Sequence, residues 1–163
     1  MGGLYIEQWP SQVLTKPSQV LKEVDADVLE LISLMVLTMG AVNGVGLSAN
    51  QVGSLIRLAV IKKDKEILTL INPEIISMEG SISMEEGCLS LIGVTAEVKR
   101  ATSVVVSALD TNMCPFKFSA KGLLARIIQH EIDHLNGKMF FDNLSRLRRE
   151  LFVRKINKKK EEK

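Results

Sequence analysis

The chain has 163 residues, of which 46% are hydrophobic and 25% are charged, and its formal net charge is +2. This composition is typical of one soluble globular domain with a sizeable core, and it excludes a disordered or fibrous chain. The longest uncharged apolar run, residues 31–42, is well short of the roughly 20 residues that a membrane-spanning helix needs. Since no secretory or transit signal is recognisable, we expect a cytoplasmic protein.

Helical and extended segments alternate along the chain. A first helix is predicted to start at Asp25 or Asp27, either of which can act as a cap, and to end near Asn43 and Gly44. Residues 44–53 contain three glycines and are predicted to form a loop. Extended segments are predicted at 55–61, 66–71, 94–109 and 115–122. A second long helix is predicted from residues 121–122 to 137, followed by a terminal helix, which makes an α+β domain spanning residues 1–163.

The C-terminal segment, residues 145–163, carries nine Lys or Arg against three Glu, whereas the other residues carry twelve basic and sixteen acidic side chains. Leu147, Leu151 and Phe152 recur at helical spacing, so we predict an amphipathic helix. Its basic side is either an ordinary solvated surface or a contact for an anionic partner such as RNA.

Residues 127–137 read IIQHEIDHLNG and contain both histidines of the chain. His130 and His134 are four residues apart, so a helix places both imidazoles on one face, where they can bind the same metal ion. The spacing is that of the H-E-x-x-H motif, in which Glu131 would take a proton from water rather than bind the ion. The alternative is a pair of helix histidines with local hydrogen bonds.

A catalytic metal site of this kind usually has three protein ligands. Phe140 occupies the position where one peptidase class has a third histidine, so that class is excluded. Two candidates remain from the residues themselves: Glu150 in the basic tail, and Cys88, next to Gly87, which permits a close backbone approach. The other cysteine, Cys114, is predicted to be a partly buried residue without a role.

Three motifs together resemble those of the peptide deformylases: GVGLSANQ at 44–51, EGCLS at 86–90 and QHEIDHLNG at 129–137. Their order and spacing match along nearly the whole chain, and the C-terminal helix is similar to that of the bacterial type 1 branch. The resemblance implies an α+β fold of mainly antiparallel strands around the HExxH-bearing helix, with helices before and after. It also implies a hydrolase that removes the formyl group from the N-terminal methionine of new polypeptides and releases formate.

By this resemblance Cys88, His130 and His134 bind one divalent metal ion, commonly Fe²⁺, with Zn²⁺, Ni²⁺ or Co²⁺ able to occupy the site. Glu131 is then the general base. Gln51 and the backbone N–H of Leu89 correspond to the donors that stabilise the developing oxyanion. The positions implied for substrate binding are Val45, Gly46, Glu86, Leu123 and Ile127, together with His130.

The implied partners are formyl-methionyl nascent peptides and, through the basic helix, the ribosome near the exit of the nascent chain. We expect a monomer that binds neither a membrane nor a specific nucleic-acid sequence. Two other functions stay open: a related Cys/His/His metal amidase or peptidase with a different substrate, and a non-catalytic protein with a structural metal site. Intact Glu131 and Gln51 argue against the non-catalytic protein.

The chain departs from the usual family pattern in three places. Leu91 is followed by Ile92 and Gly93, where an apolar residue and proline are usual. Thr95 stands where many members have an arginine that can contact the substrate backbone. Arg126 replaces what is commonly an apolar residue, and it either sits at the pocket mouth and alters substrate preference or extends into solvent.

Overall fold

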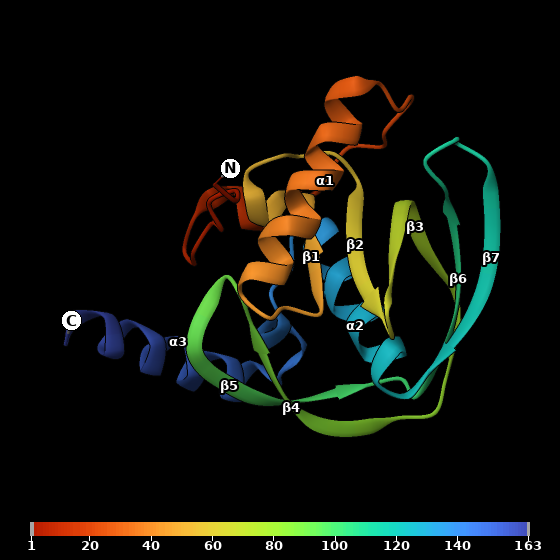
Figure 1. Cartoon of the computed structure of the whole chain (residues 1–163). Coiled ribbons are helices and arrows are strands. Elements are labelled where there is room, and N and C mark those ends of the chain that lie inside the picture. The colour runs from red at the N-terminus through yellow and green to blue at the C-terminus, as the bar shows by residue number, and fades with distance from the viewer. Residues whose placement is uncertain (1, 163) are drawn as a thin grey trace.

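The computed structural model describes residues 2–162, so residues 1 and 163, the ends of the predicted domain, lie outside it. A five-stranded sheet in the order β1-β2-β3-β6-β7 and a two-stranded ribbon, β4-β5, curve around helix α2 (Figure 1). All these strand pairs are antiparallel, as predicted. The strands are β1 (Gly46–Ser48), β2 (Leu58–Lys63), β3 (Glu66–Glu79), β4 (Ile82–Cys88), β5 (Leu91–Arg100), β6 (Ser103–Leu109) and β7 (Pro115–Lys121). The helices are α1 (Ala26–Ala41), α2 (Gly122–Leu135) and α3 (Arg146–Glu161), with short 3-10 helices at Gln12–Thr15, Ala49–Val52 and Phe140–Asn143.

Helix α1 follows the sequence prediction closely. Asp25, rather than Asp27, is the N-cap, and its side chain accepts a hydrogen bond from the backbone N–H of Val28. The helix ends when Asn43 adopts a positive φ of 53° and the N–H of Gly44 turns back to the carbonyl of Met39. This helix covers β1 and β2 through a buried cluster that includes Met35, Met39, Leu47 and Leu58.

The extended run at 94–109, predicted as one segment, is two strands. Ala101 and Thr102 separate β5 from β6, and the chain passes there from the ribbon into the larger sheet. The side chain of Gln129 accepts from the N–H of Ala101 and donates to its carbonyl, thereby replacing a neighbouring strand. Because Gln129 comes from α2, far along the chain, the sequence around residues 101–102 gives no sign of the break between β5 and β6.

Two strands were missed by the sequence prediction. In β4 the first four residues are exposed, so the strand lacks the apolar alternation that identifies others. The predicted loop at 44–53 contains the short strand β1 and a 3-10 helix instead. Both elements carry residues of the candidate site.

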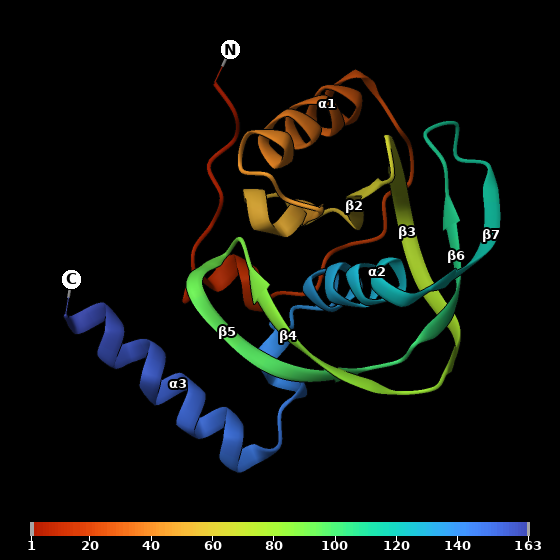
Figure 2. The ribbon, with the colours of Figure 1, turned by 60° about the horizontal axis from the view of Figure 1, so that its bottom comes forward.

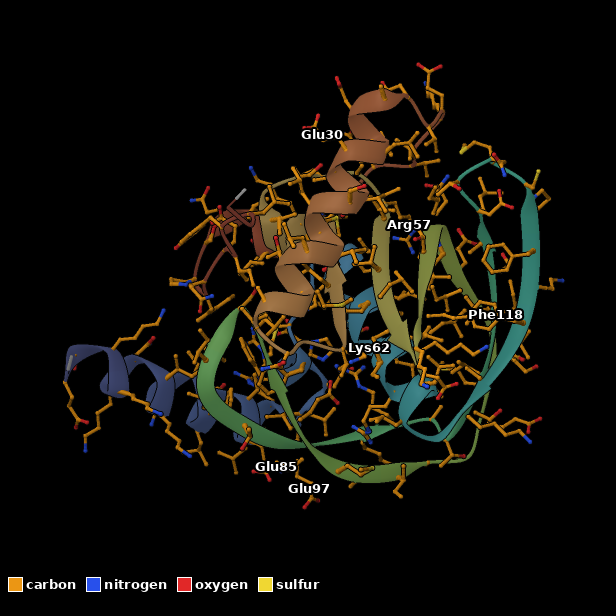
Figure 3. The ribbon with its side chains drawn as sticks, in the orientation of Figure 1. Glu30, Arg57, Lys62, Glu85, Glu97 and Phe118 are labelled. Atoms are coloured by element: carbon orange, nitrogen blue, oxygen red, sulfur yellow. The ribbon has the colours of Figure 1, made fainter. Side chains whose placement is uncertain are left out.

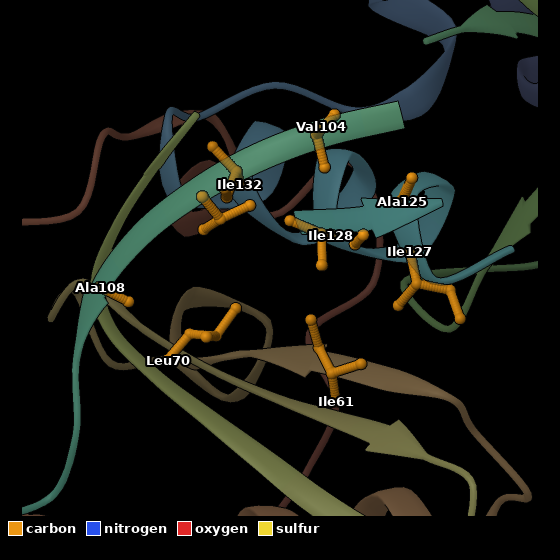
Figure 4. Packing of buried hydrophobic residues seen from close by; sticks show 10 residues of the cluster. Ile61, Leu70, Val104, Ala108, Ala125, Ile127, Ile128 and Ile132 are labelled. Carbon is orange, nitrogen blue, oxygen red and sulfur yellow. The ribbon is translucent and has the colours of Figure 1, made fainter. Parts of the chain in front are cut away.

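Helix α2 is enclosed by the curved sheets (Figure 2). Its apolar residues, including Ala125, Ile128 and Ile132, pack against Ile61 of β2 and Leu70 of β3 (Figure 4). Burial on most of its circumference fixes the position of the polar residues that α2 also carries. No helix within residues 2–162 is both long and apolar enough to cross a membrane.

Helix α3 starts after Ser145, whose side chain caps it by accepting from the N–H of Arg148. Phe152 and Ile156 are buried in a cluster with Val94 and Val98 of β5 and with Phe140 and Phe141. Leu147 and Leu151 are instead 67% and 54% exposed, so the apolar face anticipated from Leu147, Leu151 and Phe152 is wrong except for Phe152.

Candidate active site

Two segments far apart in sequence, the end of β4 and helix α2, bring three possible metal-binding side chains together. Cys88 comes from the end of β4, and His130 and His134 come from one face of α2. The Sγ atom of Cys88 lies 3.2 Å from Nε2 of His134, which lies 3.1 Å from Nε2 of His130. All three donor atoms lie within 4.8 Å of one another. The other candidate ligand, Glu150, forms an exposed ion pair with Arg146 on α3 and is not part of this group.

This donor set fits one divalent ion. In a tetrahedral site with bonds of 2.0–2.3 Å, neighbouring donor atoms are about 3.3–3.6 Å apart, close to the two separations observed. Burial lowers the pKa of His134 well below its usual value, which favours the neutral imidazole that metal ions require. Burial alone would lower the pKa of His130 as well. Hydrogen bonds to Cys88 and Glu86 outweigh this effect of burial, so the pKa of His130 is raised to about 10. An ion that binds His130 would therefore displace a proton.

Glu86 is the hydrogen-bond partner of the candidate ligand His130, with its Oε1 atom 2.5 Å from Nδ1 of the ring. Two buried arginines hold this carboxylate. Arg100 donates to both of its oxygens at 2.7 and 3.0 Å, and Arg126 donates to Oε2 at 2.7 Å. Burial tends to raise the pKa of Glu86, but hydrogen bonds from His130 and Arg100 lower it to about 2. A carboxylate so placed fixes the orientation of a ligating imidazole.

The role of Glu86 as partner of a metal ligand was not predicted, although Glu86 was expected near the substrate. Successive side chains of a strand point to opposite sides. Glu85 is accordingly exposed and lies opposite Glu97 of β5 (Figure 3). Glu86 is instead buried and contacts His130 and Arg126 of α2. Arg100 was missed altogether. It shares the inward side of β5 with Val94 and Val98, and this period of two was the signal that could have identified it.

Arg100 also connects Glu86 with the far side of α2. Its Nη1 atom donates to Oδ2 of Asp133 at 2.7 Å, and the side-chain amide of Asn143 donates to the same oxygen at 2.9 Å. Arg100 itself is buried, with both acidic partners in direct contact. Asp133 therefore connects α2 to β5 through Arg100 and to the 3-10 helix Phe140–Asn143 through Asn143.

Glu131 lies inside the site and is almost completely buried. A Cβ atom on Gly46 would lie 2.5 Å from Oε1 of Glu131, so only glycine permits this close approach of strand and carboxyl group. The Oε2 atom has no hydrogen-bond partner among the described residues. Burial, assisted by the charge of Glu86, raises the pKa of Glu131 to about 7, although His130 opposes the shift. A carboxyl group with this pKa is suited to accept and return a proton near neutral pH.

Gln51 is only 1% exposed and is held firmly by its neighbours. Its Oε1 atom accepts from the N–H and the hydroxyl of Ser48, both at 3.0 Å. This orients Nε2 toward the site, where it donates to Oγ of Ser90 at 3.1 Å and to Sγ of Cys88 at 3.5 Å. Ser90 was not predicted to have a role. Its fully buried hydroxyl beside Cys88 is a polar group that the motif EGCLS already contains.

A cavity of about 440 Å³ opens onto these groups. All the predicted site residues line it except His134, which lies fully buried behind it. The lining residues predicted from sequence are Val45, Gly46, Gln51, Glu86, Cys88, Leu89, Leu123, Ile127, His130 and Glu131.

The departures from the family pattern have different outcomes. Ile92 and Gly93 line the cavity, whereas Thr95 is not among the lining residues and donates to Glu85, which does line the cavity. Arg126 lines the cavity and is 5% exposed, so its predicted extension into solvent is wrong. Cys114 is exposed rather than partly buried, and both cysteines are free thiols.

A cavity that combines one cysteine and two histidine donors with a buried carboxyl group defines a metal-dependent hydrolase. The sequence profile of the polypeptide deformylase family matches residues 4–150, and the chain belongs to this family. It is 46% identical to a peptide deformylase of Thermodesulfovibrio yellowstonii, over 98% of this chain and 100% of that protein.

Solved structures agree with this assignment. The fold is similar to a peptide deformylase from Legionella pneumophila, with a TM-score of 0.90, 42% identity and coverage of 98% of this chain and 96% of the other. A peptide deformylase from Ehrlichia chaffeensis, solved in complex with actinonin, gives a TM-score of 0.88 and 36% identity, with 98% of each chain covered. The similarity therefore extends over the whole fold and includes all three segments that build the site.

Proposed function

We propose that this enzyme removes the formyl group from the N-terminal methionine of new polypeptides, with residues 1–163 acting as one catalytic domain. The observation that carries the proposal is the convergence of Cys88, His130 and His134 next to Glu131 in one cavity. The relatives named peptide deformylase support it, because they match nearly the whole chain.

Cys88, His130 and His134 would hold one divalent ion. We propose Fe²⁺, with Zn²⁺, Ni²⁺ or Co²⁺ able to replace it, since one thiolate and two imidazoles suit all these ions. When bound there, such an ion lowers the pKa of water toward neutrality and polarises a carbonyl group. Glu86 supports the arrangement through its hydrogen bond to His130.

Glu131 would act as the general base. Its unpaired oxygen can accept a proton from water as the water oxygen attacks the formyl carbon, and it can then return this proton to the leaving amine. The carbonyl oxygen gains negative charge in this step. Nε2 of Gln51 and the backbone N–H of Leu89 would donate hydrogen bonds to it, and the fixed orientation of the Gln51 amide prepares that donor in advance.

The substrate would lie along β1. This strand is at the edge of its sheet, so a peptide can pair with the backbone of Val45 and Gly46 as an added strand. The methionine side chain would enter the cavity beside Leu123 and Ile127, which together with Val45 provide apolar walls. The formyl group would then reach Glu131 and Gln51.

The test is formate release from formyl-Met-Ala-Ser by protein purified without oxygen, with the bound metal quantified. Acetyl-Met-Ala-Ser and Met-Ala-Ser serve as controls. Cleavage of the formyl peptide alone supports the proposal. Cleavage of the acetyl peptide in its place would identify a different metal amidase, and inertness of the metal-loaded protein toward every formyl peptide would indicate a non-catalytic role.

We further propose that the enzyme is a cytoplasmic monomer and that α3 contacts the ribosome through its basic side. Arg154, Lys155 and Lys158 are exposed on this helix. Deleting the helix is a poor test because Phe152 and Ile156 are part of the core. Substituting Lys155 and Lys158 by Glu should weaken co-sedimentation with ribosomes at low salt. The double variant Lys63→Glu with Lys65→Glu should not, since these two exposed lysines lie at the end of β2 and in the turn that follows it. Equal loss in both pairs would contradict a contact through α3.

A further inference from the structure

The N-terminal segment contacts both parts of the chain that carry the proposed oxyanion donors. It passes α1 and reaches the turn between β4 and β5 (Figure 2). The backbone N–H of Glu7 donates to the carbonyl of Gln51 at 2.8 Å, and the backbone N–H of Trp9 donates to the carbonyl of Ser90 at 2.8 Å. Residues 7–9 therefore tie Gln51 to this turn.

Gln8, between these two residues, adds a side-chain contact to the same turn. Its Nε2 atom donates to the carbonyl of Leu89 at 2.9 Å and to the carbonyl of Ile6 at 3.2 Å. Both acceptors are carbonyl oxygens, so they determine which end of the Gln8 amide faces the turn. Leu89 lies beyond the last residue pair of the β4–β5 ladder, and Gln8 supplies the partner for its carbonyl from outside the ribbon.

The side chain of Leu89 is restrained as well. It packs against a buried cluster that includes Met39 of α1. Gly44 approaches it so closely that an added Cβ atom would lie 2.9 Å from Cδ1 of Leu89. Because peptide units are planar, a residue has only two soft backbone torsions. With its carbonyl held by Gln8 and its side chain packed against α1, Leu89 has little freedom to turn its N–H.

We propose that Gln8 is a positioning residue, which keeps the backbone N–H of Leu89 directed at the formyl oxygen by holding the Leu89 carbonyl. This inference rests on the proposed deformylase function, in which Leu89 and Gln51 donate to that oxygen. Two donors stabilise a developing charge best when both are aimed at it before the reaction. Gln8 does not line the cavity, so it acts through Leu89 and not on the substrate.

The experiment compares the wild type with Gln8→Leu, which keeps the approximate size of the side chain but removes the donor. We expect kcat for formyl-Met-Ala-Ser to fall by about tenfold or more, because a misplacement of about 1 Å in such a site can cost about 10²-fold. KM should stay near its wild-type value, since the contact matters mainly when charge develops on the oxygen. Gln8→Lys returns a donor to the same carbonyl and should recover most of the loss.

Two further measurements separate positioning from general support of the site. The metal content of Gln8→Leu should equal that of the wild type. The inhibition constant of Met-Ala-Ser should also stay the same, because this product has no formyl oxygen and leaves the oxyanion donors unused. Gln12→Leu is the matched control and should keep the wild-type kcat. Gln12 is an exposed glutamine of the next 3-10 helix and does not line the cavity.

Three results would overturn the proposal. The first is an unchanged kcat in Gln8→Leu. The second is a lower kcat accompanied by loss of metal or by weaker inhibition by Met-Ala-Ser, which would mean that Gln8 supports the site as a whole. The third is a Gln8→Lys variant as slow as Gln8→Leu. All three require an active wild type, so a wild type that releases no formate would be distinguishable and would refute the deformylase function itself.

Discussion

The carboxylate of Glu86 and the imidazole of His130 form a 2.5 Å hydrogen bond between β4 and α2. Glu86 comes from the strand that also carries Cys88, so one short segment provides a ligand and orients another. Arg100 and Arg126 hold Glu86 from two further directions. The geometry of the metal site is thus set by a buried ionic cluster as much as by the helix that contains the histidines.

This cluster makes stability depend on pH. The pKa of Glu86 is lowered from 4.5 to about 2, so its charge stabilises the fold fully above pH 4.5. As the pH falls from 4.5 through about 2 this stabilisation is lost, and it amounts to something on the order of 3 kcal/mol. We expect the urea midpoint of the wild type to fall steeply in this range. Glu86→Gln should be less stable at pH 7 and should show a flatter dependence.

The measurement is urea unfolding followed by circular dichroism between pH 2 and 7, as a rough range set by this shift, in the presence of a chelator. The chelator prevents loss of the ion from contributing to the change. Parallel curves for the wild type and Glu86→Gln would show that another group is responsible.

Replacing Glu131 tests the general base. Glu131→Gln keeps the shape of the side chain but cannot accept the proton, so formate release should fall by about 10²- to 10⁴-fold. Metal content should be retained, because Glu131 is not part of the Cys88, His130 and His134 group. Glu97→Gln, at an exposed position on the ribbon, is the control and should keep normal activity. Loss of metal in Glu131→Gln would point to a ligand instead of a base.

The rate should decline on the acid side of neutrality. Burial raises the pKa of Glu131 to about 7, and a divalent ion nearby would favour the ionised form and lower this pKa. The base is therefore lost as the pH falls through or below about 7. We expect kcat/KM for formyl-Met-Ala-Ser to decrease there with the slope of a single proton. The metal content must be measured at each pH, and a flat profile at constant metal content would contradict this assignment.

The two sides of α3 should differ in their effect on stability. Phe152 is 8% exposed and packs against Phe140 and Phe141, so Phe152→Ala should lower the free energy of unfolding by about 3–5 kcal/mol. Leu151, which is 54% exposed, should cost at most about 0.5 kcal/mol when replaced by Ala. Denaturant unfolding of both variants gives the comparison. Equal losses would mean that α3 packs on a different face.

Much of the site could be predicted because its signals are local. The spacing of His130, Glu131 and His134 follows from the helical repeat, and the order of the three motifs located Cys88 and Gln51. The partners of these residues were harder to predict. Glu86 and Arg126 meet across 40 residues of sequence, and no local pattern joins a glutamate in an exposed strand to an arginine in a helix.

The fold shows the same limit. The first and second long helices were predicted within a few residues from their caps and apolar periodicity. The boundary between β5 and β6 was not, because Gln129 creates it from a distance. Strand β4 was missed because its first four residues are exposed, so it lacks the alternation of apolar and polar residues that identifies other strands.

The N-terminal segment is fixed to the site by backbone hydrogen bonds from Glu7 to Gln51 and from Trp9 to Ser90. Cys88 and His134 are separated by 46 residues of sequence. During synthesis, the thiol therefore leaves the ribosome well before either imidazole. A growing chain holds no complete ion site until α2 has emerged and packed against the ribbon. We therefore expect this chain to bind its metal ion late in its own biogenesis, so that incomplete chains would neither sequester the ion nor act on other nascent polypeptides.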